Sequence, residues 1–128
     1  MQSTDIKESE NNVEFQVEDV MHRAGNVIKV AGRCCDGVIS VGDTFEFIYL
    51  RQSYMEEGHY RESDGEKFPI LVKVLGIERS RRSLDKIYGS EAGLLKVKVL
   101  RESEIDVEPK VVFRKNDRDR PVWDRDSD

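Results

Sequence analysis

The chain has 128 residues, of which 38% are hydrophobic and 37% are charged, and its net charge is −5. This length suits one domain with a single core and excludes a second catalytic domain of ordinary size. An acidic total argues against broad nucleic-acid binding, which needs an excess of Lys and Arg on one face, although it leaves room for a local basic patch.

The first twelve residues are polar and acidic. They lack the basic start and the apolar run of a secretory signal, and no segment of the sequence approaches the ~18 apolar residues of a membrane span. We therefore expect a disordered lead over 1–12, no membrane contact and a cytoplasmic location.

Short alternating or β-branched runs, bounded by turn residues, predict strands through the first half of the chain. We expect Asp19–Met21 to continue the first strand or to start a turn, and 22–25 to form a loop. Gly32 lies inside the second strand, where it indicates a bulge or a close backbone approach. Asp36-Gly37 is typical of a hairpin turn. The strands expected in this half are Val13–Val17, Asn26–Arg33, Val38–Val41 and Thr44–Leu50.

The second half alternates strands with long polar stretches. We interpret 51–67, which is polar and acidic, as a long inserted loop or a protruding hairpin. The basic stretch 78–87 predicts a short turn or one helical turn, and 114–128 predicts a charged tail. The strands expected in this half are Phe68–Ile77, Leu94–Leu100 and Val111–Phe113. No stretch has helical periodicity over three turns, so the sequence predicts an all-β domain over 13–113, a small barrel or sandwich.

One ordered set of motifs points to a family. The set contains an acidic-Asp-Val step, a strand ending in Gly-Arg, an acidic-x-Gly turn and a Val-Gly step, followed much later by an Ala-Gly turn. Its members are Glu18-Asp19-Val20-Met21, Gly25, Val30-Ala31-Gly32-Arg33, Asp36-Gly37-Val38-Ile39, Val41-Gly42-Asp43, Ser83-Leu84-Asp85-Lys86 and Glu91-Ala92-Gly93. The set resembles the second domain of translational GTPases, the β-barrel domain of elongation factor Tu, and covers roughly Phe15 to Arg101.

The resemblance implies a small closed Greek-key β-barrel with a long inserted loop or hairpin and flexible termini. It also implies a non-catalytic binding module whose partner is a protein or a ribonucleoprotein of the translation machinery, with RNA binding possible. The residues that it places on the rim of a binding pocket are Glu18, Asp19, Met21, Glu78 and Arg81. The chain departs from the family at Met21, where an aromatic residue is usual. It also has no Gly-x-x-x-x-Gly-Lys-Ser/Thr loop, so we expect no nucleotide.

Two further surfaces are candidates for partner contact. Arg79, Arg81, Arg82 and Lys86 form the one basic cluster. Together with Lys96 and Lys98 it is a candidate positive patch, since arginine pairs well with phosphate or carboxylate. The stretch 51–67 carries tyrosines among acidic residues, a combination found at protein interfaces. Its candidate contact residues are Tyr54, Glu56, Glu57, Tyr60 and Glu62. The alternative function is therefore a small acidic inhibitor of the immunity or antitoxin type, which blocks a basic partner protein.

Cys34 and Cys35 are adjacent in sequence, and on a strand their side chains point to opposite faces. A disulfide between them would be strained, so we expect one thiol in the core, one outside, and both reduced. His22 combined with either thiol matches no zinc-finger spacing, and no residue is placed to orient it as a base. We expect no metal, cofactor or enzymatic activity, and an enzyme that uses Cys34 or Cys35 is the weakest alternative.

Overall fold

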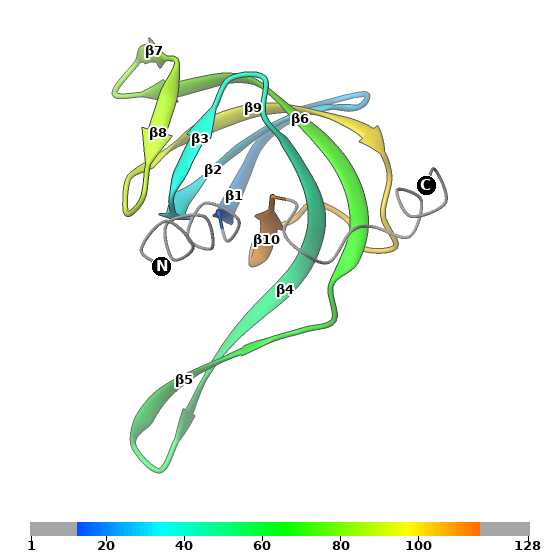
Figure 1. The fold of residues 1–128 in the computed structure, drawn as a ribbon. Coiled ribbons are helices and arrows are strands. Elements are labelled where there is room, and N and C mark those ends of the chain that lie inside the picture. Colours follow the sequence, from blue (N-terminus) through cyan, green and yellow to red (C-terminus); the bar gives the residue numbers. More distant parts are fainter. Residues whose placement is uncertain (1–12, 116–128) are drawn as a thin grey trace, which may run out of the picture.

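The computed structural model describes residues 13–115. The lead expected over 1–12 and nearly all of the expected tail lie outside this range. Residues 13–115 contain ten strands and no helix, so no helix there could cross a membrane. The all-β class is confirmed (Figure 1). The strands are β1 (Glu14–Ala24), β2 (Val27–Asp36), β3 (Val38–Ser40), β4 (Thr44–Glu56), β5 (His59–Asp64), β6 (Phe68–Arg79), β7 (Arg82–Leu84), β8 (Lys86–Tyr88), β9 (Ala92–Arg101) and β10 (Val111–Arg114).

Six of the strands pair in a ring. Neighbours follow the order β1, β2, β9, β6, β4 and β10, and β10 pairs again with β1. Every pairing in the ring is antiparallel, and Figure 1 shows the strands curving around one shared interior. β5 and β7 extend the sheet as hairpin partners of β4 and β6, whereas β3 and β8 form a separate two-stranded sheet.

The core fills the inside of the ring because inward positions alternate along each strand with outward ones. Most of the inward side chains are β-branched or aromatic, which suits a pleated and half-buried surface. Phe45 and Phe113 stack with ring centroids 5.4 Å apart. Each fully buried Val, Ile or Phe contributes roughly 1.5–3 kcal/mol. The largest fully buried side chains of this core are Phe15, Phe45, Phe113, Ile39, Ile48, Ile70, Ile77, Ile87 and Leu95.

The pairing of β1 with β2 has three irregularities, of which one leaves Cys35 of β2 as an extra residue and two leave an extra residue in β1. Val17 pairs with Gly32 and Asp19 with Ala31, which leaves Glu18 as an extra residue. The same happens between Val20 and His22, where the extra residue is Met21. Such bulges change the direction of a strand and re-aim the side chains that they contain.

Two local predictions are wrong, and a third is decided in favour of one of its two alternatives, the short turn. His22–Ala24 belongs to β1 rather than to a loop, because β2 pairs with it up to Val27. Asp36-Gly37 does make a turn, but the next strand pairs with β8 instead of folding back on β2. The stretch 78–87 holds a hairpin turn at Ser80-Arg81 and no helical turn.

The polar stretch 51–67 contains a protruding hairpin, which is one of the two structures predicted for it. The second half of β4 pairs with β5 from Arg51–Asp64 to Glu56–His59, and Glu57 and Gly58 close the turn. Figure 1 shows this two-stranded ribbon projecting away from the ring. We call the segment 51–64 the arm.

Candidate binding surface

An open hollow lies on the outside of the ring where β1, β2, β6 and β9 meet. It has a volume of about 280 Å³. The strands that cross its floor carry little side-chain volume there, since four of the lining residues on β2 and β9 are alanine or glycine: Ala31, Gly32, Ala92 and Gly93. We call it the rim hollow, and its lining residues are Glu18, Ala31, Gly32, Glu78, Arg79, Ser80, Arg81, Ala92, Gly93 and Leu94.

The structure brings together three of the five rim residues that the resemblance implies. Glu18, Glu78 and Arg81 line the rim hollow, and the bulge in β1 is what places Glu18 there. Asp19 lies beside it as the direct partner of Ala31. Met21 is exposed but is not among the lining residues, because it occupies the second bulge, further along β1.

The turn between β6 and β7 holds arginine at the edge of the rim hollow. Ser80 and Arg81 have φ values of 54° and 66°, in the left-handed region that Gly and Asn adopt more easily. Of the arginines around this turn, Arg79 pairs with Glu91. The Tyr88 amide and Arg79 hold the pKa of Glu91 below its ordinary value. Arg81 and Arg82 have no ion pair within residues 13–115.

Four lysines continue this surface across the outside of β2, β9 and β6. Lys29 lies directly opposite Lys96, and Lys98 lies directly opposite Lys73. Directly opposed residues of antiparallel strands have Cβ atoms about 4.5–5.5 Å apart, and like charges in such pairs are destabilising. We call Lys29, Lys73, Lys96 and Lys98 the lysine row.

The lysine row is poorly neutralised by the protein itself. Lys29 pairs with Glu78 across 3.0 Å, which joins the row to the rim hollow. Lys73, Lys96 and Lys98 make no ion pair within the described residues. An acidic protein therefore concentrates unpaired positive charge on one face.

The predicted basic cluster is only partly assembled. Arg79 and Arg82 are opposed across the β6–β7 hairpin, close to the rim hollow. Lys86 lies on β8, which belongs to the small second sheet and pairs with β3. Lys96 and Lys98 lie on β9 outside the lining of the rim hollow, directly opposite Lys29 and Lys73 respectively. The sequence analysis did not single out Lys29 and Lys73, because each stands alone between apolar residues and only strand pairing reveals its neighbours.

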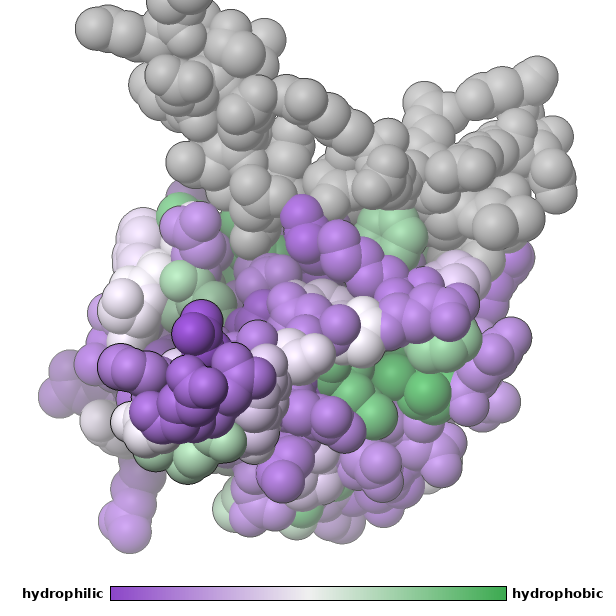
Figure 2. Space-filling view, turned by 90° about the horizontal axis from the view of Figure 1, so that it is seen from below, coloured by the Kyte–Doolittle hydropathy of each residue, from purple (hydrophilic) through white to green (hydrophobic). Residues whose placement is uncertain are grey.

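The arm distributes the predicted acidic contact residues over two faces. Directly paired residues share a face, so Tyr60 and Glu62 lie with Ser53 and Met55, whereas Tyr54 and Glu56 lie with Arg61 on the other face. Arg61 pairs with Glu56 across 3.8 Å, and Glu57 occupies the turn. Figure 2 shows the molecule from the side toward which the arm projects, where the surface is mostly hydrophilic with small separate hydrophobic areas.

A polar network holds the base of the arm to the ring. Arg51 donates to Asp64 across 2.8 Å and to the Tyr49 hydroxyl across 2.8 Å, and Tyr49 donates to Glu14. Burial and the hydrogen bond to Glu14 raise the pKa of Tyr49, and Arg51 holds the pKa of Asp64 below its ordinary value. These groups satisfy one another, so we assign them a structural role.

The two thiols are placed as the strand alternation predicts. Cys34 is fully buried, Cys35 is half-buried, and both are free. Burial raises the pKa of Cys34 to about 11 and also raises that of Cys35. Cys34 pairs with Phe15, whereas His22 pairs with Lys29, five residues further along β2. That separation, about 16 Å along a strand, keeps His22 from acting as a base for Cys34.

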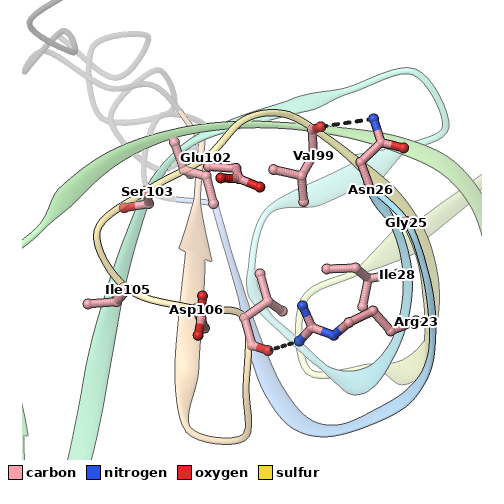
Figure 3. A pocket seen from close by; sticks show the side chains of 11 residues that line it. Arg23, Gly25, Asn26, Ile28, Val99, Glu102, Ser103, Ile105 and Asp106 are labelled. Carbon is pink, nitrogen blue, oxygen red and sulfur yellow. Dashed lines mark hydrogen bonds between the residues drawn. The ribbon is translucent and has the colours of Figure 1, made fainter.

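A second, smaller pocket was not foreseen from the sequence (Figure 3). It measures about 110 Å³, against roughly 300–1,000 Å³ for typical small-molecule sites. The loop 102–107 closes it, and Arg23 fastens that loop by donating to the Val107 carbonyl across 2.6 Å.

No protein-family model matches this chain, and no curated protein is significantly similar to it in sequence.

Proposed function

We propose that the protein is a non-catalytic binding module that contacts an RNA-containing partner of the translation machinery. In this proposal the ring of strands is a closed Greek-key barrel of the kind found in the second domain of elongation factor Tu. The contact surface is the rim hollow together with the lysine row. No nucleotide or cofactor takes part.

The observation that carries the proposal is the lysine row. The two directly opposed lysine pairs, Lys29 with Lys96 and Lys73 with Lys98, repel and so destabilise the folded state. Within residues 13–115, the only ion pair that reduces this repulsion is that of Lys29 with Glu78. A polyanion that lies across β2, β9 and β6 would offset the repulsion from outside. Arg81 and Arg82, at the edge of the rim hollow, add donors that suit phosphate.

The described thiols give little support to the enzyme alternative. A thiol attacks as its thiolate, and burial raises the pKa of Cys34 to about 11, so that little thiolate is present near neutral pH. The inhibitor alternative is supported less well than the RNA-binding one, because the acidic side chains of the arm face two directions. In addition, three acidic residues in and beside the arm are already paired with arginine: Glu14 and Asp64 with Arg51, and Glu56 with Arg61.

The test is binding to a labelled RNA duplex, measured by fluorescence anisotropy over a salt series, beside co-sedimentation with ribosomes. The variant Lys96→Gln/Lys98→Gln removes two charges from the lysine row. The matched control, Lys67→Gln/Lys110→Gln, removes two charges from exposed lysines elsewhere. We expect the first pair to lower the slope of log affinity against log salt by about 1.4 to 1.8, the value for two lost phosphate contacts, and the control to leave it unchanged.

Equal salt slopes for the two double variants would contradict the proposal, as would failure of the wild-type protein to bind either RNA or ribosomes. Retention of a single basic protein from a cell extract, resistant to salt and lost when the acids of the arm are neutralised, would favour the inhibitor function instead.

A further inference from the structure

The arm is a two-stranded ribbon with almost no core of its own. All six residues of β5 are exposed, and so are Ser53–Glu56 of β4. A two-stranded ribbon is at best marginally stable in water without a third strand or a surface against which to pack. The arm nevertheless has a regular register over its whole length, which raises the question of what completes it.

One edge of the arm has unused backbone groups. β10 pairs with β4 only as far as Leu50, and the Arg51 amide then donates to the Lys110 carbonyl across 2.9 Å. Backbone groups alternate in direction along a strand, so the N–H and C=O of Ser53 and Met55 point to the same side as the Arg51 amide. Beyond Arg51 that side has no partner strand within residues 13–115.

The hairpin turn shows independently that the backbone groups of Ser53 and Met55 point to the open edge. Glu57 and Gly58 have φ values of 51° and 81°, as in a two-residue type I′ turn. Such a turn is closed by a hydrogen-bonded pair, here Glu56 with His59. The hydrogen-bonded pairs of the arm are therefore those of Glu56, Tyr54 and Gln52 with β5, which leaves Ser53 and Met55 directed outward.

This open edge lacks the devices that usually prevent edge-to-edge pairing. Exposed edges typically carry Lys, Pro or an irregularity in the strand. The edge Gln52–Glu56 has none of these, and it exposes 45% of Tyr54 and 67% of Met55.

We propose that the open edge of β4 pairs antiparallel with the same edge of a second copy of this chain, about a twofold axis at Tyr54. Ser53 of each copy then exchanges both backbone hydrogen bonds with Met55 of the other. Tyr54 faces Tyr54 of the other copy in a non-hydrogen-bonded pair, where side chains approach most closely. Gln52 faces Glu56 of the other copy, as an amide beside a carboxylate.

The length of the edge fits this pairing. Arg51 is already bound to Lys110, and the turn begins at Glu57, so the available residues are those from Gln52 to Glu56, with Tyr54 at their centre. The result is a four-stranded sheet in the order β5, β4, β4, β5. Because the arm projects away from the ring in Figure 1, antiparallel pairing places the two rings at opposite ends of that sheet.

The outer edge of β5 is a poorer candidate for the same contact. Its outward backbone groups include those of Tyr60 and Glu62, so the register that uses both of them places the twofold axis at Arg61. That register opposes two arginines, which repel. Tyr54 at the axis of the β4 edge brings two apolar rings together instead.

Cysteine crosslinking of the full chain tests the register. Tyr54→Cys places two thiols in a close cross-strand pair, whereas Arg61→Cys places a thiol on the same face of the arm but on the other strand. Under mild oxidation we expect Tyr54→Cys to form a reducible covalent dimer at least about tenfold faster than Arg61→Cys, because pairing raises the effective thiol concentration. Wild-type protein gives the background from Cys34 and Cys35. Equal rates for the two variants would overturn the proposal.

Light scattering coupled to size-exclusion chromatography tests the hydrogen bonds. Ser53→Pro removes an N–H that points to the open edge and leaves the backbone hydrogen bonds between β4 and β5 in place, with loss of the Ser53 hydroxyl bond to Tyr60. Glu62→Pro removes the outward N–H of the residue directly opposite. We expect wild type and Glu62→Pro to dimerise with rising concentration and Ser53→Pro to stay monomeric. Tyr54→Lys, which opposes two like charges at the axis, should also be monomeric. A monomeric wild type, or dimers in all four proteins, would sink the idea.

Discussion

Gly32 shows how one residue sets the packing between two strands. A Cβ atom at this position would lie 2.0 Å from the Gln16 carbonyl oxygen and 2.7 Å from the Phe15 ring. The contact with the backbone cannot be relieved by a side-chain rotation, so β1 and β2 must separate. The close approach that Gly32 was predicted to permit is thus confirmed.

We expect Gly32→Ala to lower the free energy of unfolding by about 2–4 kcal/mol, measured by urea denaturation, because the strand pair must shift to admit the methyl group. Gly76→Ala is the matched control, since the nearest atom to a Cβ on Gly76 is 3.9 Å away. A loss of stability as large in Gly76→Ala would show that strand propensity, rather than the contact with Gln16, decides the effect.

Cys34 makes stability fall at alkaline pH. Its folded pKa is about 11, above the ordinary value of 9.0, because burial disfavours the thiolate. The unfolded thiol therefore loses its proton first, and the folded state is stabilised fully below pH 9 and progressively less as pH rises to 11. We expect this one group to remove at most about 2–3 kcal/mol over that range.

The measurement is urea denaturation at several pH values between 8 and 11, with Cys34→Ala compared to its own stability at pH 8. The variant should show a shallower alkaline decline than the wild type. Cys35→Ala should make the decline shallower as well, because burial also raises the pKa of Cys35. Identical slopes in wild type and Cys34→Ala would contradict the assignment.

Much at the residue scale could be predicted from the sequence. Strand alternation alone places Cys34 and Cys35 on opposite faces, and a glycine inside a strand, such as Gly32, indicates a close backbone approach. The two bulges in β1 were missed. Their signal is a spacing of three instead of two between residues of the same face, from Val17 to Val20 and again from Val20 to Arg23, which is exposed but pairs with the buried Ile28. Short strands contain few such intervals, so one break is hard to distinguish from the end of a strand.

At the scale of elements, the β6–β7 turn combines strain with an exposed arginine. A non-glycine residue in the left-handed region destabilises the folded state by about 1–2 kcal/mol. Glycine removes this strain, but it also increases the conformational entropy of the unfolded chain, so the net gain in stability is smaller. We expect Ser80→Gly and Arg81→Gly each to raise the free energy of unfolding by about 0.5–1 kcal/mol. Only Arg81→Gly should weaken RNA binding, since Ser80→Gly keeps the guanidinium.

Thermal unfolding and the anisotropy titration check this pair together. If both variants bind RNA as tightly as wild type, Arg81 has no role at the contact surface. If neither is stabilised, the turn is held by its surroundings without strain.

The strands were largely predictable, whereas their partners were not. Alternation in Leu94–Leu100 and Phe68–Ile77 identifies strands locally, but pairing brings together residues that are far apart in sequence, such as Lys29 and Lys96. The sequence does not decide between a loop and a hairpin for the arm, because the residues of β5 are all exposed and no apolar pattern marks that strand.

At the scale of the whole molecule, the lysine row is expected to have two opposite effects: it lowers the stability of the fold and it favours binding of RNA. Replacing Lys96 by Gln removes the repulsion from Lys29, so we expect the free energy of unfolding to rise by about 0.5 kcal/mol at low salt. The gain should shrink at high salt, where surface charges are screened. Lys86→Gln is the control, because Lys86 is directly opposed by the uncharged Ser40.

Urea denaturation at low and high ionic strength measures both effects. A Lys96→Gln variant less stable than the wild type would mean that Lys96 contributes to folding, which would remove the main support for RNA binding. A gain in stability together with weaker binding is the pattern expected of a functional surface.

The sequence predicted the fold class, since short strands without helical periodicity leave few other architectures. It could not predict the closed order of six strands. That order depends on β10 pairing with both β1 and β4, and Val111–Arg114 is too short to indicate its neighbours. The family resemblance supplied the barrel expectation and the rim residues, of which Glu18, Glu78 and Arg81 lie together.

The seam between β1 and β10 determines how the molecule would respond to force. Glu14 pairs with Arg114 and Gln16 with Val112, so the described chain enters and leaves at the same end of the seam. Tension applied between residues 13 and 115 therefore separates the pairs one after another, as a zipper opens, rather than shearing them together. The ring should be mechanically soft along this direction, and a motor that pulls on the C-terminal side would extract β10 first and open the interior to water.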